Sequence, residues 1–397
     1  MPAPEVLLIE GSDYETFPAG GQLTMARCLI KLFGDRLALV GETAGDEPAG
    51  RWTKKEIAGA PRWFFPVHRR RPMARRPLIP ARLRFYASVK RYRKEIESLG
   101  CRSVFLQAPE ALMAVAGWNW DSLCFWFPGV ENPLKVSRYW WARQFCQAFD
   151  YLMFSALDRA SVVLAAADEN AILKLVARSK GRLNRERLVG LPTCVDTTVF
   201  RPQPMLAARA ALGIDPARTV FVNSGRIGRF KGWQLLLDAL EEYLRKDPRA
   251  LLLFVGDGED RAAVEASIAA RNLQESARVT GFQSPPQVAA FLNAANVAVF
   301  GSFVEGWSAS MLEALACGKP MVSTDVSGVK SMVAAGENGF IVNGRNAADF
   351  AQAMDKALNL ANAEKVSTSI AAEFDLPHLG ASLGRLWPPL AAPEPAR

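Results

Sequence analysis

Two glutamates, Glu305 and Glu313, stand eight residues apart in the stretch SFVEGWSASMLEALACGKPMVSTDV, residues 302–326. The pattern predicts a strand over Val297–Phe300, a loop that holds Glu305, a helix over 308–316 that holds Glu313, and a further strand over Met321–Thr324. A helix start exposes unbonded backbone N–H groups and the positive end of the helix dipole, which together bind anions. Gly306 would let a ligand approach the backbone closely. Taken alone, each glutamate could have a purely structural role. A glutamate before a helix often only pairs with the helix dipole, and a glutamate within a helix usually faces solvent.

Two basic residues follow the first predicted strand of the C-terminal half, which covers 219–223. Arg226 and Lys231 could clamp a diphosphate, the first through its planar fork and the second as a point charge. Gly225 beside them would leave the backbone open. Such residues lie where strands give way to helices, which is where open α/β sheets bind ligands.

Three further turns follow predicted strands in the same half. Gly256 and Asp257 end one strand, and the turn could pass a nucleotide base. Phe282 ends the run Thr280-Gly281-Phe282, whose backbone could meet the edge of the base. The run 323–328 would close the phosphate side. Together with the glutamates, these turns suit a nucleotide diphosphate joined to a sugar.

Strands alternate with helices along the whole chain, which is typical of parallel doubly wound sheets. The first half is expected to hold strands at 6–9, 37–40, 103–106, 122–127 and 161–165, with helices at 22–33, 80–99, 109–117, 134–156 and 167–178. The second half is expected to hold strands at 219–223, 250–255, 277–280, 297–300, 321–323 and 340–342, with helices at 205–212, 233–245, 260–272, 285–293, 308–316, 328–334 and 346–359.

The length of 397 residues exceeds one ordinary core, so we expect two domains. A Pro-rich segment near 195–205 is the best linker, which gives an N-terminal domain over 1–195 and a C-terminal domain over 196–375. Residues 376–397 would form a helix and a tail that packs back toward the N-terminal domain. The expected fold class is therefore α/β, with two Rossmann-like domains facing each other across a central cleft.

Amino-acid composition argues against a membrane-spanning protein, a secreted protein and a histidine-rich metal site. No uncharged apolar run reaches about 18 residues, so no membrane-spanning helix is expected, and the start MPAPEVLLIEG looks like a first strand rather than a signal peptide. The six cysteines are scattered in apolar settings and predict reduced core thiols in a cytoplasmic protein. With two histidines, a histidine-rich metal site is not expected.

The net charge of +8 is concentrated in one stretch. Between Ile57 and Lys94 the sequence has twelve Lys and Arg residues, no acid, and interleaved aromatic residues such as Trp63, Phe64 and Phe65. Basic and apolar residues together favour contact of residues 62–94 with an anionic membrane surface. The alternative is a solvated helix face with a loop. Nothing resembles an RNA-binding or helix-turn-helix signature, so nucleic acid is not an expected partner.

A cluster of tryptophans, Trp118, Trp120, Trp126, Trp140 and Trp141, lies in the second quarter of the chain. Core and interface packing is the ordinary interpretation. Some of these rings could instead form an acceptor groove.

From about 220 to 342 the sequence strongly resembles the retaining glycosyltransferases of family 4, which have the GT-B fold. The resemblance rests on SGRIGRFKG, FVGDGED, VTGF and EGWSASMLEALACGKPMVSTDVSGV, with the family's E-x7-E pattern at Glu305 and Glu313. LPTCVDTTVFRP resembles the interdomain segment, with Asp196 at its usual acid. The N-terminal half matches only through Gly20, Gly21 and the order of its strands.

The resemblance implies roles for these residues. Arg226 and Lys231 would neutralise the donor diphosphate, and Glu305 would face the donor sugar or stabilise positive charge at its anomeric carbon. Glu313 would accept hydrogen bonds from the ribose hydroxyls. Backbone N–H groups at Trp307, Ser308 and Ala309 would hold the phosphate or sugar, while Gly20 and Gly21 would approach the diphosphate. No metal and no cofactor are expected besides a UDP- or GDP-sugar as co-substrate.

The sequence departs from the family pattern at two places. Many members carry a histidine after a central strand of the N-terminal domain, whereas this chain has Phe125-Trp126-Phe127-Pro128-Gly129, followed by Glu131 and Asn132 as possible substitutes. The small glycine-rich run after the first acid is replaced by 307–310, which begins with a bulky Trp307 that we expect to shape the sugar pocket. Because of these two changes, the resemblance does not identify the donor sugar.

The leading interpretation is a retaining, metal-independent hexosyl- or N-acetylhexosaminyltransferase. Its acceptor would be a glycan or a lipid-linked molecule of cell-surface polysaccharide or lipopolysaccharide synthesis, at the inner face of the cytoplasmic membrane. One alternative is a GT-B nucleotide-sugar 2-epimerase, whose chemistry would want more histidines and acids. Another is a non-catalytic nucleotide-sugar-binding or scaffold subunit, which would be expected to lack Arg226, Lys231 or Glu305.

Overall fold

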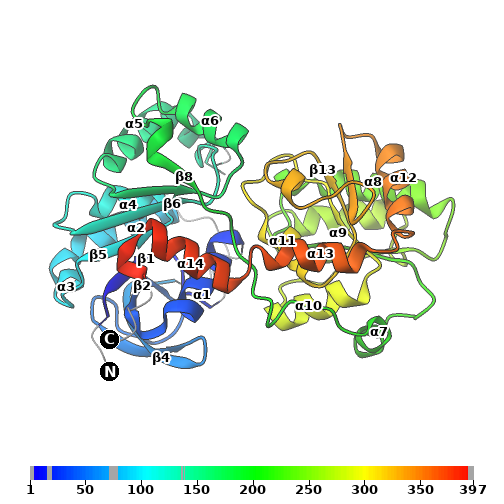
Figure 1. The fold of residues 1–397 in the computed structure, drawn as a ribbon, viewed down its shortest axis with the longest axis horizontal. Helices are drawn as coiled ribbons and strands as arrows, with labels where there is room; N and C mark the ends of the chain where they lie inside the picture. Colours follow the sequence, from blue (N-terminus) through cyan, green and yellow to red (C-terminus); the bar gives the residue numbers. More distant parts are fainter. Residues whose placement is uncertain (1–3, 16–19, 71–78, 136, 138, 392–397) are drawn as a thin grey trace. The chain divides into compact units, whose positions relative to one another are not determined.

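The computed structural model describes residues 4–15, 20–70, 79–135, 137 and 139–391, and everything below refers to these residues. The chain divides into two compact units. Unit 1 comprises Met1–Pro192 and Pro377–Arg397, and unit 2 comprises Thr193–Leu376 (Figure 1). The boundaries expected from the sequence were 195/196 and 375/376.

Unit 1 is built on a sheet with the strand order β3-β4-β2-β1-β5-β6-β7-β8. All neighbouring strands pair in parallel except β3, which forms an antiparallel hairpin with β4. From β4 to β7 the order is the 3-2-1-4-5-6 order of Rossmann-like sheets. The strands are Val6–Ile9 (β1), Leu37–Thr43 (β2), Thr53–Ile57 (β3), Ala60–Arg69 (β4), Ser103–Leu106 (β5), Ser122–Phe127 (β6), Val162–Ala165 (β7) and Leu188–Gly190 (β8).

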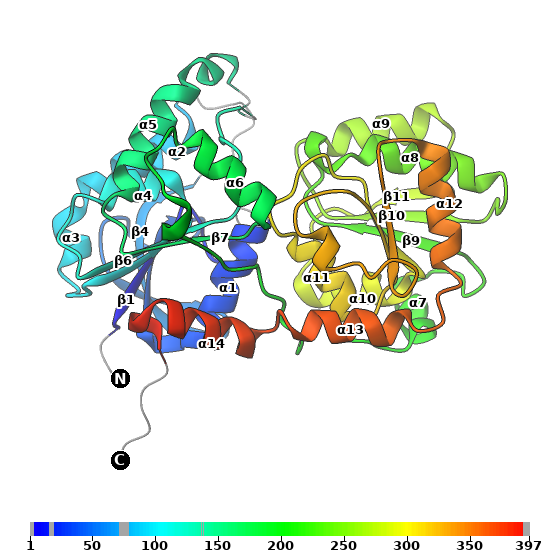
Figure 2. The ribbon, with the colours of Figure 1, turned by 45° about the horizontal axis from the view of Figure 1, so that its top comes forward.

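The helices of unit 1 cover both faces of this sheet (Figures 1 and 2). They are Gly21–Phe33 (α1), Ala81–Arg91 (α2), Arg93–Glu97 (α3), Pro109–Val115 (α4), Cys146–Leu157 (α5), Glu169–Arg178 (α6) and Leu376–Leu386 (α14). Short 3-10 helices lie at Gly34–Arg36 (η1), Trp140–Phe145 (η2), Arg185–Arg187 (η3) and Pro388–Leu390 (η6).

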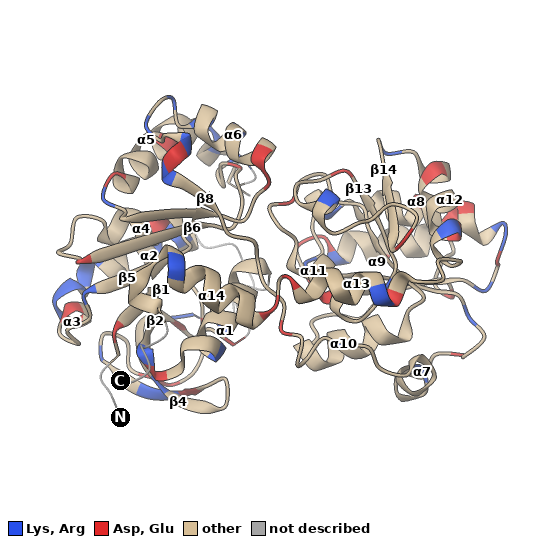
Figure 3. Ribbon diagram, in the orientation of Figure 1, with Lys and Arg blue, Asp and Glu red and all other residues tan. Residues whose placement is uncertain are grey.

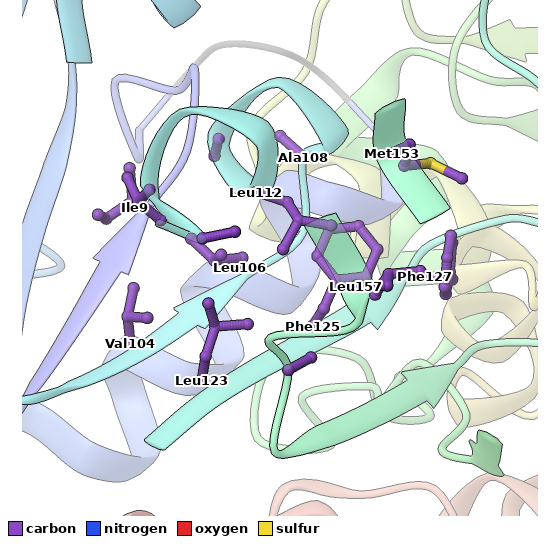
Figure 4. Close-up of a cluster of buried hydrophobic side chains, with 14 of the residues drawn as sticks. Ile9, Val104, Leu106, Ala108, Leu112, Leu123, Phe125, Phe127, Met153 and Leu157 are labelled. Atoms are coloured by element: carbon purple, nitrogen blue, oxygen red, sulfur yellow. The ribbon is translucent and has the colours of Figure 1, made fainter. Parts of the chain in front are cut away.

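The core of unit 1 follows from the two-residue period of its strands. Alternate residues such as Ile9, Leu106 and Phe125 are fully buried and pack with α2, α4, α5 and α6 on one face (Figure 4). The residues between them face the other layer, where Phe105 meets Trp387. Strands buried on both faces read as continuous apolar runs, which is why the sequence revealed them.

Unit 2 is built on a parallel sheet with the order β11-β10-β9-β12-β13-β14, which is again 3-2-1-4-5-6. Its strands are Val220–Ser224 (β9), Leu251–Val255 (β10), Ala277–Val279 (β11), Val297–Phe300 (β12), Met321–Thr324 (β13) and Gly339–Val342 (β14). Its helices are Met205–Leu212 (α7), Trp233–Leu244 (α8), Arg261–Ala270 (α9), Pro285–Ala294 (α10), Ala309–Ala316 (α11), Ala347–Ala357 (α12) and Ala363–Ala372 (α13), with 3-10 helices at Arg229–Lys231 (η4) and Val329–Ser331 (η5).

The core of unit 2 lies between its sheet and the layer of α8, α9 and α12. Phe221, Phe254 and Phe350 are buried there. On the opposite face α10 packs on α7 and α11 packs on α13. The expectation of two Rossmann-like α/β domains is therefore confirmed.

The helix α14 returns the chain to unit 1 after the whole of unit 2. Trp387 is fully buried beside Phe105, and its Nε1 donates to Ser122 Oγ over 2.7 Å. Arg36 donates to the carbonyl oxygens of Pro389 and Ala391 at 2.9 and 2.8 Å. The segment 377–391 is thus an integral part of the unit 1 core.

Several predicted helices differ from the structure. Residues 80–99 form two helices, because the backbone leaves helical geometry at Tyr92. The predicted helix 134–156 is the 3-10 helix η2 followed by α5, and its described residues before Tyr139 are not helical. The predicted helix 328–334 is only the 3-10 turn η5. The short strand β8 was not predicted.

The basic stretch has more regular structure than the sequence suggested. Its first part is strand β4 of the β3–β4 hairpin, and Phe64, Phe65 and Phe85 are buried in the core rather than exposed. Several of its cations pair with acids from elsewhere, including Arg62 with Asp35, Arg69 with Asp46 and Arg82 with Glu110. Helix α3 carries both signs of charge (Figure 3). Residues 71–78 of the predicted membrane surface lie outside the described residues.

Two other expectations concern the membrane and the cysteines. Among the described residues, no helix is both long enough and apolar enough to cross a membrane. Five of the six cysteines are buried, while Cys146 is partly exposed.

Candidate active site

The predicted site residues of unit 2 gather at the carboxyl edge of its sheet, around β9 and β12. These strands are neighbours, and the chain order reverses between them because β10 lies on the far side of β9. Loops that leave two such strands diverge and open a crevice at the sheet edge. The loop after β9 supplies Lys231, and the loop after β12 supplies Glu305.

Lys231 and Glu305 form a close ion pair at this edge. Lys231 Nζ lies 2.7 Å from Glu305 Oε1 and 2.9 Å from Oε2. Ser302 Oγ donates to Glu305 Oε1 over 2.6 Å, and the carbonyl of Ser302 accepts from Thr324 Oγ1 at 2.6 Å. The Glu305 side chain is 9% exposed and that of Lys231 is 35% exposed. The carboxylate is therefore fixed from two sides, while the Lys231 side chain stays partly exposed.

Two glycines bring the loops that carry this pair into contact. Gly232 has φ +65°, and a Cβ there would lie 1.8 Å from the carbonyl oxygen of Gly301. Only a residue without a side chain allows the backbone after Lys231 to approach the end of β12 so closely. The position of Lys231 beside Glu305 thus depends on Gly232.

The start of α11 forms the next part of the site. Ser308 is its N-cap residue, but the Ser308 side chain makes no capping hydrogen bond. The first N–H groups of a helix have no intrahelical acceptor, so those near Ser308 and Ala309 point toward the loop end with partial positive charge. Gly306 precedes them without a side chain, and Glu313 lies within the helix, partly exposed.

The side chain of Trp307 does not line an open pocket. It is 9% exposed and packs against Phe374, with ring centroids 5.4 Å apart, and against Gly328. Its carbonyl oxygen accepts a hydrogen bond from Thr193 Oγ1 at 3.0 Å. The structure therefore places the Trp307 ring in the packing of unit 2, which differs from the expected role in shaping a sugar pocket.

Arg226 pairs with an acid that was not predicted from the sequence. Its Nε and Nη2 donate to the two carboxylate oxygens of Glu259 at 2.9 and 3.0 Å. The pair is solvent-accessible, with side chains 51% and 30% exposed. Arg226 can therefore reach an anion only by leaving or sharing Glu259.

The remaining predicted turns also follow strands of the unit 2 sheet. Gly225 has φ +118° and lies against Ser310 at the start of α11, and Gly256 lies against the carbonyl of Gly225. Asp257 Oδ1 accepts from the N–H of Gly258 at 2.7 Å. Phe282 is 49% exposed after β11. These residues share the sheet edge with Lys231, but no direct contact joins Asp257 or Phe282 to the Lys231–Glu305 pair in the described part of the chain.

Two predicted donor-binding residues belong to unit 1. Gly20 is the N-cap of α1, with φ +132°, and Gly21 is the first residue of that helix. Both are exposed and have open space around a hypothetical Cβ. Residues 16–19 of the preceding loop lie outside the described residues.

Unit 1 also has buried polar groups at the carboxyl edge of its sheet. Glu10, directly after β1, is 2% exposed, and its Oε2 accepts from Gln107 Nε2 at 2.7 Å. Burial, reinforced by the charge of Glu110, raises the pKa of Glu10 to about 8. This group was not predicted, because an acid after a strand carries no distinctive motif.

The possible substitutes for the missing histidine have structural contacts. Asn132 is fully buried and donates to the Cys146 carbonyl and to Asp150 Oδ1 at 3.0 and 2.8 Å. Glu131 is an exposed partner of Lys135. Neither contact indicates a ligand-facing role.

A third cation lies beside the Lys231–Glu305 pair and was also missed. Arg345, in the loop after β14, donates through Nη1 to the Gly301 carbonyl at 2.9 Å, and its guanidinium lies 3.5 Å from the centre of the Phe303 ring. No motif marked it, because its position depends on the contact between β14 and the β12 loop. No cluster of three or more His, Cys, Asp or Glu side chains suited to a metal occurs in the described residues.

The match to a known protein family lies in unit 2. Residues 206–372 match the family model described as "Glycosyl transferases group 1". The chain is 36% identical over 171 residues to a D-inositol 3-phosphate glycosyltransferase of Rhodococcus opacus, covering 41% of this chain and 38% of the relative. It is 33% identical over 182 residues to the same enzyme of Nocardia farcinica, covering 44% and 40%. The matches thus span about two fifths of the length of these curated relatives.

Solved structures resemble the whole chain. Anabaena Alr3699/HepE, crystallised with UDP and glucose, has a TM-score of 0.74 at 18% identity, with 96% of this chain and 98% of that chain covered. Sucrose-phosphate synthase of Thermosynechococcus elongatus has a TM-score of 0.77 at 18% identity, covering 98% and 99%. At such low identity these likenesses show the fold. Unit 2 therefore matches the glycosyl transferases group 1 model over residues 206–372, and the whole chain has the GT-B fold.

Proposed function

We propose that the protein is a retaining glycosyltransferase that uses a nucleotide diphosphate sugar, such as a UDP- or GDP-sugar, as donor. The acceptor is a glycan or a lipid-linked molecule of cell-surface polysaccharide or lipopolysaccharide synthesis. The group 1 match over 206–372 and the activity for which the relatives are named support sugar transfer. The observation that carries the proposal is the Lys231–Glu305 pair at the switch point of the unit 2 sheet.

In this proposal Lys231 stabilises the charge that develops on the departing diphosphate. A preorganised cation at such a position contributes several kcal/mol to lowering the barrier. The Lys231 side chain is partly exposed, while hydrogen bonds from Ser302 and Lys231 hold Glu305 in place. Glu305 then faces the donor sugar and stabilises positive charge at its anomeric carbon.

The other residues of the edge bind the donor. Arg226 exchanges Glu259 for a phosphate oxygen, and the N–H groups at Trp307, Ser308 and Ala309 bind the phosphate or sugar at the start of α11. Glu313 accepts from the ribose hydroxyls. Gly20 and Gly21 keep the role that the family resemblance gives them, the approach of bare backbone to the diphosphate. With cations stabilising the leaving group, the reaction is proposed to need no metal ion.

A thermal-shift panel of UDP, GDP, ADP and their sugar conjugates tests the proposal. A ligand at a hundred times its dissociation constant adds about 2.7 kcal/mol of stability, which is a readable shift. We expect one nucleotide series to stand out, and Lys231→Ala to lose that shift. Lys246→Ala is the matched control, because Lys246 pairs with Asp355 at 2.6 Å on the surface of unit 2. If no nucleotide stabilises the wild type, the donor site is wrong and a scaffold role is favoured.

The proposal includes peripheral contact of residues 62–94 with an anionic membrane at the cytoplasmic face. In the described part of this stretch, Lys90, Arg91 and Lys94 are exposed and have no carboxylate partner, while Ile79 and Leu83 are 62% and 53% exposed. Because the buried aromatic residues of the stretch cannot meet lipid, this contact is mainly electrostatic, and Ile79 and Leu83 are its exposed apolar side chains. It should weaken as salt shortens the Debye length.

A further inference from the structure

Four large apolar side chains are exposed together on η2 and α5 of unit 1. Trp140 is 74% exposed, Phe145 54%, Tyr151 57% and Leu152 56%. We name these four residues the aromatic surface. Water-exposed apolar side chains that occur singly are ordinary, whereas four within the thirteen residues 140–152 indicate a contact site.

Helix α5 is apolar on opposite sides. Its inner side buries Met153, Phe154 and Leu157 in the core of unit 1, so the helix does not need further apolar residues to dock there. Ala148 and Leu152, four residues apart, lie on one outer face and are both exposed. The outer side of α5 therefore exposes apolar side chains that nothing in the described chain covers.

The charges around the aromatic surface indicate what covers it. Between 139 and 152 the only acid is Asp150, which is largely covered and lies 3.4 Å from Arg178 Nε. Arg143 is exposed on η2, and the guanidinium of Arg182 lies 4.1 Å from the centre of the Tyr151 ring. Exposed Trp and Tyr rings bordered by cations match the chemistry of the phospholipid headgroup layer, where aromatic residues concentrate.

The basic helix α2 belongs to the same helical layer of unit 1 as α5. Helix α4 contacts both α2 and α5, and all three pack on the same face of the unit 1 sheet (Figure 2). Lys90 and Arg91 are exposed on α2. One face of unit 1 thus has an aromatic part and a basic part, an arrangement that suits a membrane better than a second protein with an acidic or a purely apolar surface.

We propose that the aromatic surface of η2 and α5 inserts into the headgroup region of a phospholipid bilayer. The contact is apolar, so it differs from the mainly electrostatic contact of residues 62–94 and does not depend on the nucleotide site. It would present unit 1 to acceptors that reside in a membrane, and this last consequence rests on the proposed function.

Vesicle flotation of the full chain separates the two contacts. At about 1 M salt, where the Debye length is about 3 Å, wild type is expected to float with vesicles of phosphatidylcholine alone. The double variant Trp140→Ser, Leu152→Ser should bind such vesicles at least about tenfold more weakly, because each large side chain contributes more than about 1.4 kcal/mol when buried. Leu206→Ser is the matched control, since Leu206 is 66% exposed on α7 of unit 2.

A second pair of variants tests the basic part. Lys90→Gln with Arg91→Gln should reduce only the additional binding that phosphatidylglycerol gives at low salt. Wild type that fails to float with neutral vesicles at high salt, or a double variant that floats like wild type, overturns the proposal. So does a wild-type dimer in light scattering that becomes monomeric in the double variant without a change in flotation. No nucleotide is present in these assays, so their outcome is separate from that of the thermal-shift panel.

Discussion

Lys231 is the residue on which the proposed chemistry most depends. Lys231→Ala should lower turnover by about 10²- to 10³-fold, because it removes the cation that meets the leaving diphosphate. Initial rates with the nucleotide sugar selected by thermal shift measure this. Lys246→Ala should keep wild-type turnover. A Lys231→Ala enzyme with near-normal turnover would falsify the assignment.

A second prediction concerns Glu259, because its carboxylate pairs with the guanidinium of Arg226. If Arg226 must exchange this carboxylate for a phosphate, Glu259→Gln should lower the donor KM by up to about fivefold, since exposed ion pairs are worth about 1 kcal/mol or less. Glu265→Gln is the control, because Glu265 pairs with Arg261 at 2.9 Å on the same side of unit 2. A raised KM in Glu259→Gln would instead mean that Glu259 orients Arg226.

Glu10 makes stability depend on pH. Its pKa is raised from the ordinary 4.5 to about 8, chiefly by burial, so the folded protein retains a proton that the unfolded chain has lost. Stability should therefore fall as pH rises from about 4.5 to about 8. Glu10→Gln keeps the oxygen that accepts from Gln107 and should remove this part of the fall. Urea midpoints across this range measure it, and equal slopes in both proteins would exclude the effect.

At the scale of elements, the contact between the β9 and β12 loops is the decisive feature. Gly232 and Gly213 have nearly the same left-handed φ, +65° and +64°. A Cβ added at Gly232 would lie 1.8 Å from a backbone oxygen, whereas one added at Gly213 would meet open space. Gly213→Ala should cost about 1 kcal/mol.

Gly232→Ala should cost about 3 kcal/mol or more and should also reduce turnover, since the loop that carries Lys231 must shift. Urea unfolding of the two variants under identical conditions measures the difference. Equal destabilisation by both substitutions would mean that the close approach of the loops is not required.

Helices and strands could be predicted from the sequence where the burial of their side chains alone determines the structure. The central parallel strands were recovered because both of their faces are covered, as Val6–Ile9 and Val297–Phe300 show. The β3–β4 hairpin was missed because its basic residues suggested a solvated segment, although Phe64 and Phe65 pack inward. Residues 140–145 form a 3-10 helix whose Trp140 is exposed, which a rule that buries large aromatic residues could not anticipate.

The same distinction applies to the site. Lys231, Glu305 and the start of α11 could be named because their spacing within one loop or helix is local. Glu259 and Arg345 could not, because their contacts with Arg226 and Gly301 arise only when loops from different strands meet. The buried position of the Trp307 ring depends on Phe374, which is 67 residues further along the chain.

At the scale of the whole molecule, unit 1 is made from two separate segments. Trp387→Ala should destabilise unit 1 by about 3–5 kcal/mol, because the side chain is fully buried against Phe105. Hydrogen exchange should show lost protection in β5 and β6, with β9 to β14 unchanged. Arg385→Ala is the control on the same helix, since Arg385 is exposed. Equal loss of protection in both units would show that they unfold together.

The return of α14 to unit 1 also sets an order of events during synthesis. Unit 2 is one continuous segment, Thr193–Leu376, and at about 5–20 residues per second the ribosome needs roughly 10 to 40 s to make it. During that time the part of the unit 1 sheet that Trp387 covers, around Phe105, remains exposed. Unit 1 therefore begins to be synthesised first but is completed last. Until then its sheet exposes apolar surface that can aggregate.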